Sequence, residues 1–411
     1  MTDVGIVGAG LAGLACARAL HRSGVSFTVY DPADAVGGRV RTARQDGFQI
    51  DRGFQVLLTA YPEARRVLDY DALDLQAFSP GALVHLAGGF ERVGDPFRRP
   101  LQAVPSLLAD VGTVADKLRV LRLRQSVLST SSDALWQRPE TTTEDALRTR
   151  YGFSETMIDR FFRPFLGGVL LDRTLSGSSR AFEVYFRRFS QGVAAVPADG
   201  MQAIPEQLAD GLPPGSVKLG AEVEGVSRNG VRVAGREVSH RAVVVATDAR
   251  AAGRLLDVEV PAWKSTVQIA WSAPRPPTDE PILMLDGDGV GPVNNVQVMS
   301  AVAASYAPPG RSLVTASLLG QHDADDLALD AAARGQLFDW FGAQVDTWTP
   351  VRVDRVPDAL PDLPSLSPPE RGARLADGLY VTGDWRRNAS LNGALVSGRH
   401  AAEAVLADLG A

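Results

Sequence analysis

Three glycines near the start of the chain have the spacing of a turn that binds the pyrophosphate of a dinucleotide. Gly8 permits a tight turn, Gly10 lets the backbone approach the pyrophosphate, and Gly13 lets the following helix pack against a strand. The backbone N–H groups of Leu11 and Ala12, at the start of that helix, would face the phosphates together with the positive end of the helix dipole. These residues therefore predict a dinucleotide site.

An acidic residue follows at the distance along the chain that such a site requires. Asp31 can accept hydrogen bonds from a ribose diol, and its negative charge disfavours the 2′-phosphate of NADP. The elements that must position it are a short apolar strand over residues 3–7, a helix that continues to about Ser23, and a β-branched and aromatic strand over residues 25–30. This unit alone does not distinguish NAD from FAD.

A glycine pair, Gly37 and Gly38, follows and is accompanied by Arg39 and Arg41. The glycines would let the backbone approach a second part of the ligand, and the arginines would neutralise phosphate or fix neighbouring carbonyl groups. A solvated basic loop is an equally good interpretation of these four residues taken alone. An extra phosphate contact at this place is more than a plain NAD site needs.

A third segment of this kind lies near the C-terminus. A strand ends at Gly383, Asp384 follows it, and the last helix begins near Asn392, Gly393 and Ala394. Asp384 can bind a polyol hydroxyl, and the N-terminus of the helix can stabilise negative charge on a reduced isoalloxazine ring. An NAD-only protein has no use for this segment, so the sequence favours FAD.

Residues 8–14, 30–31, 37–42 and 383–399 together resemble the signatures of the flavin-containing amine oxidase superfamily, which includes amine oxidases, protoporphyrinogen oxidases and carotenoid (phytoene) desaturases. Members more often carry Glu at the position of Asp31. The resemblance implies that the segment turning on Gly53 passes near the flavin and the substrate cavity, and that the backbone of Val223 contacts the adenine. The lone Cys16 lies on the apolar side of the first helix, which disfavours a thioether link, so we expect non-covalent FAD.

The resemblance also indicates residues near the flavin. Amine oxidases of the superfamily often place a lysine that holds a water against flavin N5. In this chain the nearest match is Gln268, because Lys264 comes too early in the segment. This departure weighs against amine oxidation without excluding it. Gln268, Trp271 and Trp385 are the residues that we expect to face the flavin.

The predicted fold class is α/β, with two domains assembled from discontinuous segments. A doubly wound Rossmann-type FAD-binding domain would comprise residues 1–70, 199–250 and 370–411. A substrate domain of antiparallel sheet plus helices would comprise residues 71–198 and 251–369, with 71–198 mostly helical.

The function that follows is oxidation of a small apolar or amine-bearing substrate by hydride transfer to flavin N5, with oxygen or another electron acceptor. The missing lysine and the aromatic residues of the middle segment favour desaturase- or protoporphyrinogen-oxidase-like chemistry. The alternative is a flavin amine oxidase that makes an imine and hydrogen peroxide. A non-catalytic binding protein, such as the Rab escort proteins that share this fold, is a third possibility, which the intact glycines and Asp384 disfavour.

The composition indicates which partners, metal sites and cellular compartment to expect. The net charge of −6 argues against nucleic acid as a partner, and five histidines with no cluster give no support to a metal site. One cysteine excludes a disulfide framework, and neither a leader nor a spanning segment is evident, so we expect a cytoplasmic protein. Residues 107–129 predict a basic amphipathic helix. We favour an ordinary solvated face for its basic side over peripheral membrane contact by about two to one.

Overall fold

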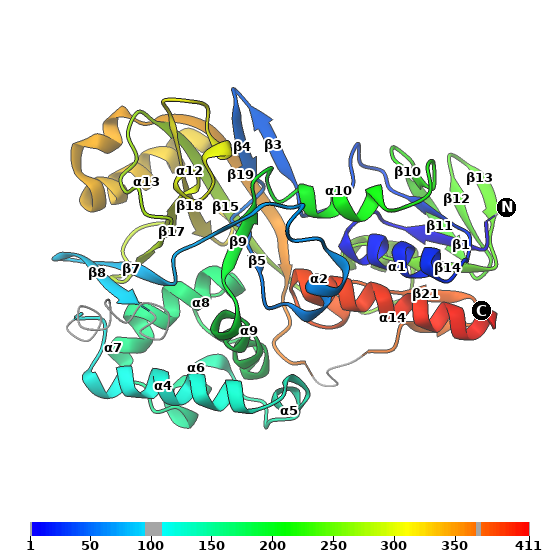
Figure 1. The fold of residues 1–411 in the computed structure, drawn as a ribbon, viewed down its shortest axis with the longest axis horizontal. Helices are drawn as coiled ribbons and strands as arrows, with labels where there is room; N and C mark the ends of the chain where they lie inside the picture. Colours follow the sequence, from blue (N-terminus) through cyan, green and yellow to red (C-terminus); the bar gives the residue numbers. More distant parts are fainter. Residues whose placement is uncertain (1, 95–108, 367–370, 411) are drawn as a thin grey trace.

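A six-stranded sheet organises one end of the molecule, and its strands come from distant parts of the chain (Figure 1). The computed structural model describes residues 2–94, 109–366 and 371–410. In spatial order the strands are β10 (Val217–Lys218), β2 (Phe27–Tyr30), β1 (Val4–Val7), β14 (Ala242–Val245), β21 (Leu379–Val381) and β20 (Arg374–Ala376). All pairs are parallel except β20–β21. Strand β14 thus lies between β1 and β21, more than 230 residues after β1 in the sequence.

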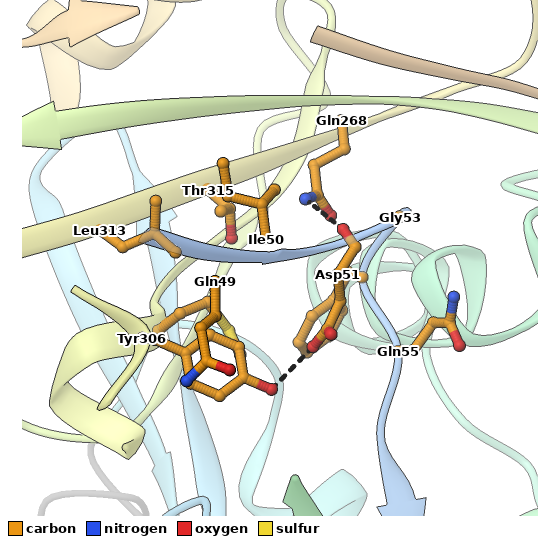
Figure 2. Close-up of a pocket in the computed structure, with 11 residues that line it drawn as sticks. Gln49, Ile50, Asp51, Gly53, Gln55, Gln268, Tyr306, Leu313 and Thr315 are labelled. Atoms are coloured by element: carbon orange, nitrogen blue, oxygen red, sulfur yellow. Dashed lines mark hydrogen bonds between the residues drawn. The ribbon is translucent and has the colours of Figure 1, made fainter. Parts of the chain in front are cut away.

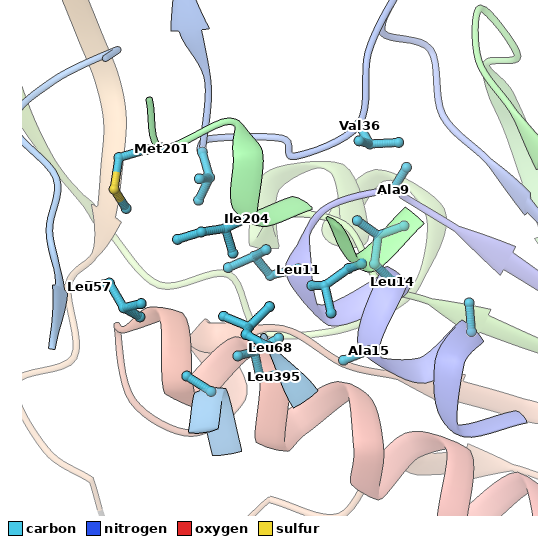
Figure 3. Packing of buried hydrophobic residues seen from close by; sticks show 14 of the residues in the cluster. Ala9, Leu11, Leu14, Ala15, Val36, Leu57, Leu68, Met201, Ile204 and Leu395 are labelled. Atoms are coloured by element: carbon cyan, nitrogen blue, oxygen red, sulfur yellow. The ribbon is translucent and has the colours of Figure 1, made fainter. Parts of the chain in front are cut away.

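Helices cover one face of this sheet and form the largest apolar core with it (Figure 3). They are α1 (Leu11–Arg22), α10 (Ala203–Asp210) and α14 (Leu391–Leu409). Leu14 of α1 and Leu395 of α14 are fully buried, and Figure 3 shows them within the same cluster as Ile204 of α10. Each such side chain contributes about 1.5–3 kcal/mol on leaving water. The axes of α1 and α14 come very close, since a Cβ at Gly398 would lie 2.0 Å from Ala12 O.

A meander of three strands and helix α11 (Ala249–Leu255) cover the other face of the sheet. The strands are β11 (Val223–Ser227), β12 (Gly230–Val233) and β13 (Arg236–Ser239), joined in antiparallel order. The helix and the meander bury a second apolar layer that includes Val231, Val243 and Trp385. With both faces covered, β1 and β14 consist entirely of buried residues, as parallel strands require.

A seven-stranded sheet forms the second centre of the molecule. Its spatial order is β19 (Thr349–Pro361), β15 (Trp263–Ala273), β18 (Ser312–Leu319), β17 (Val293–Val298), β16 (Leu283–Asp286), β7 (Gly81–Leu86) and β8 (Gly89–Gly94). Only β16–β7 is a parallel pair. Helix α13 (Asp326–Phe341) packs on one face through Leu329, Ala333 and Leu337. Pro357 and Pro361 lie in β19, an edge strand, where the missing N–H costs no ladder bond.

Helices from residues 114–191 form a third apolar core. They include α4 (Val114–Ser129), α5 (Ser132–Trp136), α8 (Arg163–Leu170) and α9 (Ser179–Gln191). Residues 71–198 were expected to be mostly helical, but residues 81–94 form the hairpin β7–β8, whose alternating apolar residues join the seven-stranded sheet. Within this segment, the described helices therefore begin only with α4 at Val114.

Lys117 and Arg119 of α4 bind other groups of the protein, whereas Arg122 is exposed. Lys117 Nζ donates to Ala109 O, and Arg119 pairs with Asp116 at 2.9 Å. The first residues of the expected 107–129 helix lie outside the described part, and contact of α4 with a membrane stays a prediction. In the described ranges, every helix is too short or too polar to cross a bilayer.

Three smaller groups of elements connect the two large sheets. They are the hairpin β3 (Thr42–Gln45) and β4 (Phe48–Asp51), the sheet of β5 (Leu57–Leu58), β9 (Ala194–Pro197) and β6 (Leu75–Ala77), and helix α2 (Pro62–Val67). The predicted fold class, mixed α/β with a Rossmann-type sheet and a second, largely antiparallel sheet, is confirmed. The proposed domain boundaries stay a prediction.

Candidate cofactor and substrate site

The first glycine turn is built as its spacing predicts. Gly8 has a φ of +108°, which favours glycine, and a Cβ at Gly13 would lie 1.9 Å from Gly8 O. A Cβ at Gly10 would meet no protein atom within 4 Å. Gly10 precedes α1 as its N-cap residue and offers no side-chain cap, so the N–H groups of Leu11 and Ala12 have no intrahelical acceptor. Open space therefore faces the first turn of α1.

The second glycine pair lies against the first turn. Gly37 N donates to Ala9 O at 2.9 Å, and Gly37 forms an isolated parallel bridge with Gly10. Gly38 is exposed with a φ of +62°, and a Cβ there would lie 3.6 Å from Gly10 Cα. The two glycine segments thus form one cradle of backbone in which no side chain fills the space beside Gly10.

Asp31 lies at the end of β2 and braces this cradle. Its carboxylate accepts hydrogen bonds from Ala9 N at 2.7 Å and Ala33 N at 2.8 Å. Its carbonyl accepts from Ala221 N at 2.9 Å, so the start of β11 with the buried Val223 lies nearby. The adenosine contacts expected of Asp31 and Val223 stay predictions.

Arg39 and Asp384 meet beside the cradle. Arg39 Nη2 lies 2.6 Å from Asp384 Oδ1, and Nη1 donates to Ala359 O at 3.1 Å. Burial alone would lower the pKa of Arg39, but neighbouring carboxylates, first that of Asp384, outweigh it and raise that pKa. Gly383, with a φ of +154°, turns the chain so that Asp384 faces Arg39. Residues from the two predicted motifs are therefore in contact.

Arg41 lies apart from this pair. Its guanidinium is 2.7 Å from Asp34, whose side chain is 87% exposed. The ion pair therefore lies at the outer edge of the glycine loop, and the phosphate contact expected of Arg41 stays a prediction.

The N-terminus of α14 is held by a side-chain cap and by contacts with neighbouring segments. Ser390 caps the helix by accepting from Gly393 N at 2.9 Å, and a Cβ at Gly393 would lie 2.1 Å from Asn388 O. Asn392 Oδ1 accepts from Glu63 N at 3.0 Å, which fastens the start of α2 to α14. Ala394 follows in the same turn and is half-buried. Close packing against Asn388 therefore requires glycine at position 393.

A cavity lies between β4, β15, β18 and the turn at residues 304–306, and Figure 2 shows the residues that line it, among them Gln268, Gly53 and Thr315. Gln268 Nε2 donates to Asp51 O at 2.9 Å. Gly53, two residues after Asp51, has a φ of +80° and turns the chain past Thr266. The cavity holds about 210 Å³ of space, including some open to solvent.

Asp51 anchors one side of this cavity. Its Oδ1 accepts from Met201 N at 2.9 Å and from the Thr42 hydroxyl, and its Oδ2 accepts from the Tyr306 hydroxyl at 2.8 Å. Burial raises the pKa of Asp51 above its usual value despite these donors. Asp51, Tyr306 and Thr315 were not anticipated as site residues; the available signal was the polar alternation of Gln49 and Asp51 in an otherwise apolar strand.

Two expected residues do not face the cavity. Trp271 is fully buried on the face of β15 opposite Gln268, and its Nε1 donates to Asp330 at 2.5 Å. Successive side chains of a strand point to opposite faces, so Trp271, three residues after Gln268, lies on the other face of β15. Trp385 is 1% exposed in the core beneath the six-stranded sheet, where Nε1 donates to Thr247 O. Both expectations are corrected.

Lys264 lies apart from Gln268. Its Nζ is 3.3 Å from Asp172 and 3.3 Å from Asp362, which ties the turn after α8 to the end of β19. No lysine is among the described residues that line the cavity. In the same described part of the chain, no group of three His, Cys, Asp or Glu side chains could hold a metal ion.

The residues present fit an FAD molecule. The space beside Gly10, which a Cβ would fill, admits a pyrophosphate against the first turn of α1. The buried Asp384, held by Arg39, offers an acceptor to the polyol, and the start of α14 offers N–H groups farther along. These groups come from both ends of the chain.

The chain is similar in sequence to enzymes named as porphyrinogen oxidases. The chain is 26% identical over 172 residues to protoporphyrinogen oxidase 2 of Arabidopsis thaliana, covering 40% of this chain and 32% of the relative. It is 27% identical over 212 residues to coproporphyrinogen III oxidase of Mycobacterium leprae (strain TN), covering 51% and 45%. The chain thus spans about a third to a half of the length of these relatives.

A solved structure extends the likeness to the whole fold. Putrescine oxidase bound to putrescine matches with a TM-score of 0.74 at 17% identity, covering 99% of both chains, and at this identity the likeness concerns the fold alone. The sequence profile of the family described as flavin containing amine oxidoreductase matches residues 11–406. The chain therefore belongs to the flavin-containing amine oxidoreductase family, as the resemblance of its motifs implied.

Proposed function

We propose that this protein is an FAD-dependent oxidoreductase that removes hydride from a C–H bond of a small substrate. The observation that carries the proposal is the contact between Arg39, beside the glycine cradle, and Asp384, beside the last helix. A cofactor that reaches from α1 to α14 needs both ends of this arrangement, whereas a shorter dinucleotide site needs only the first. The bound flavin would supply the hydride acceptor, and the protein supplies orientation and electrostatics.

The chain's own residues have distinct roles in this proposal. The first turn of α1 and Arg39 bind the phosphates, Asp384 orients the polyol, and the start of α14 favours negative charge at the far end of the ring. The cavity beside Gln268 receives one group of the substrate.

Non-covalent attachment is part of the proposal. Cys16, on α1, is fully buried in the largest apolar core, and burial raises the pKa of its thiol to about 12. A thiol in this state is a poor nucleophile and lies away from the cavity-lining residues.

For the substrate, we favour desaturation or porphyrinogen-type oxidation over amine oxidation. Gln268 occupies the place where a lysine would be expected, and Lys264 is held by two carboxylates elsewhere. Two of the relatives act on porphyrinogens according to their names. Oxygen or another acceptor would reoxidise the flavin, and we place the reaction in the cytoplasm or at a membrane surface.

A visible spectrum of the purified chain after addition of FAD tests the cofactor. We expect oxidised-flavin bands near roughly 370 and 450 nm, and full release of the flavin on acid precipitation. A spectrum without these bands would overturn the proposal, and flavin retained in the precipitate would overturn non-covalent attachment.

An anaerobic bleaching panel then tests the substrate class. We expect porphyrinogens or polyenes to bleach the 450 nm band and primary amines to leave it unchanged. Bleaching by amines alone would reverse the preference. Hydrogen peroxide formed on readmitting air would identify oxygen as the acceptor.

A further inference from the structure

The seven-stranded sheet has two chemically different faces. Toward α13 it presents Val267, Ile269 and Val296, and all three are buried in an apolar core. Toward the cavity and α8, alternate residues of the same strands are neutral and polar. These are Gln268 of β15, Asn295 and Gln297 of β17, and Thr315 and Ser317 of β18, each at most 4% exposed.

The polar residues form a chain of hydrogen bonds with one direction. Asn294 Nδ2 donates to Pro164 O at 3.0 Å and to Asn295 Oδ1 at 2.9 Å. Asn295 Nδ2 donates to Gln297 Oε1 at 3.0 Å, and Gln297 Nε2 donates to Thr315 Oγ1 at 2.8 Å. A backbone carbonyl can only accept, so Pro164 O fixes the amide orientation at the start of the chain, and each following amide must point the same way.

Thr315 ends this chain as a free donor. Its Oγ1 already accepts from Gln297, and its hydroxyl proton has no acceptor among the described residues. Thr315 also lines the cavity. A hydroxyl has one donor and two acceptor positions, so the proton of Thr315 is available to a group in the cavity.

Gln268 supplies the matching acceptor. Its Nε2 donates to Asp51 O, which fixes this amide as well, and its Oε1 has no partner within the described ranges. Gln268 lies opposite Ser317, and Thr315 lies opposite Ala270. Gln268 and Thr315 are therefore diagonal neighbours on one face, with Cβ atoms roughly 7 Å apart.

The cavity offers no free negative charge to a cation. Asp51 is the only charged side chain among the described residues that line it, and it accepts from Thr42, Met201 and Tyr306. Figure 2 shows the Asp51 side chain turned toward Tyr306, on the side of β4 away from Gln268 and Thr315. An ammonium group beside Gln268 would lose its hydration without gaining an ion pair.

We propose that Thr315 and Gln268 form a neutral donor–acceptor subsite that binds an uncharged hydrogen-bonding group of the substrate, such as a lactam, an amide or a hydroxyl. The proposal rests on the proposed function, whose substrate class it narrows. The cavity is small, so it holds one polar group of the substrate rather than the entire molecule.

Three five-membered rings of similar shape test the subsite on the full chain loaded with FAD. 2-Pyrrolidone carries a donor and an acceptor, 1-methyl-2-pyrrolidone carries only the acceptor, and pyrrolidine is a cation at pH 7. Ligand-observed NMR titration gives their dissociation constants without any turnover. We expect 2-pyrrolidone to bind about tenfold more tightly than its methyl derivative, because that derivative leaves Gln268 Oε1 unpaired, and pyrrolidine to bind most weakly.

Variants of Thr315 and Gln268 test which side chain makes each of the two hydrogen bonds to the lactam. Thr315→Val should weaken the binding of 2-pyrrolidone and of its methyl derivative by about tenfold each. Thr315→Ser keeps the hydroxyl and should bind both lactams as tightly as the wild type. Gln268→Met should remove the difference between the two lactams. Thr266→Val is the matched control, because the Thr266 hydroxyl lies on the same face but donates to Leu318 O at 2.9 Å.

The outcomes separate this proposal from the proposed function. The flavin spectrum of each sample reports FAD binding independently. With FAD bound, a tighter affinity for pyrrolidine, equal affinities of the two lactams, no measurable binding, or an unchanged Thr315→Val variant would each overturn the subsite and leave the flavin proposal standing. If Thr315→Val fails to fold, Gln268→Met and Thr315→Ser still decide the question.

Discussion

Arg39 Nη2 and Asp384 Oδ1 lie 2.6 Å apart although 345 residues separate them in the chain. The Asp384 side chain is only 7% exposed, and it also accepts from Trp385 N at 3.0 Å. This contact joins the glycine loop of the N-terminal βαβ unit to the strand that precedes the last helix. It therefore fixes both ends of the candidate cofactor site with one ion pair.

Asp384→Ala should weaken FAD binding by about 10- to 100-fold, because the variant removes a charge-assisted hydrogen bond and frees Arg39. Fluorescence quenching during FAD titration measures the effect. Asp377→Ala is the matched control, since Asp377 pairs with Arg374 at 2.6 Å but is 85% exposed. Equal FAD affinities of the two variants would contradict the role given to Asp384.

Gly10→Ala should impair FAD binding, whereas Gly13→Ala should impair the stability of the apoprotein. Gly10→Ala should lower the stability of the apoprotein by less than about 1 kcal/mol, since its Cβ meets no protein atom within 4 Å, yet reduce FAD binding by filling the cradle. Gly13→Ala should destabilise the apoprotein by about 1–3 kcal/mol or more, because its Cβ would lie 1.9 Å from Gly8 O. Melting curves with and without FAD distinguish them; a large loss of apoprotein stability in Gly10→Ala would argue against an open cradle.

Tyr306→Phe should destabilise the fold by about 1–3 kcal/mol. The variant removes the hydroxyl that donates to Asp51 Oδ2 and leaves a buried carboxyl oxygen unpaired. Tyr70→Phe should be nearly neutral, because the Tyr70 hydroxyl is buried without a hydrogen-bond partner in the described structure. Thermal unfolding compares the two, and a greater loss in Tyr70→Phe would be inconsistent with the network around Asp51.

Asp172→Asn should show a pH-dependent loss of stability. Burial alone would raise the pKa of Asp172, but hydrogen bonds from Thr174 and Ser176 and the charge of Lys264 outweigh it and lower that pKa to about 2. The unfolded value is about 3.9, so the stabilisation is complete above that pH and is lost as the pH falls toward 2.

At neutral pH this group contributes about 1–2 kcal/mol after allowance for solvent screening. The difference in Tm between the wild type and Asp172→Asn should therefore be largest near pH 7 and shrink at pH 3. Asp377→Asn serves as the exposed control. A difference that grows on acidification would have the wrong sign for a lowered pKa.

Local sequence predicted the parts of the site that depend on backbone conformation. The spacing of Gly8, Gly10 and Gly13 indicated the turn, and Gly8 has the positive φ that such a turn requires. The prediction for Trp271 was wrong because a residue three positions from Gln268 lies on the other face of a strand. Which face of β15 meets the cavity depends on α13 and β4, which come from distant parts of the chain.

By itself, the sequence predicted a dinucleotide site with a ribose acid, and a second motif near residue 384 that belongs with it. These features are local, since the φ preferences of glycine and the alternation of strands act over a few residues. Tertiary structure alone decided that Arg39 contacts Asp384, that Trp385 turns into a core, and that Gln268 and Thr315 share one face. Such contacts follow from strand register and helix packing between distant segments, and no short stretch of sequence contains both partners.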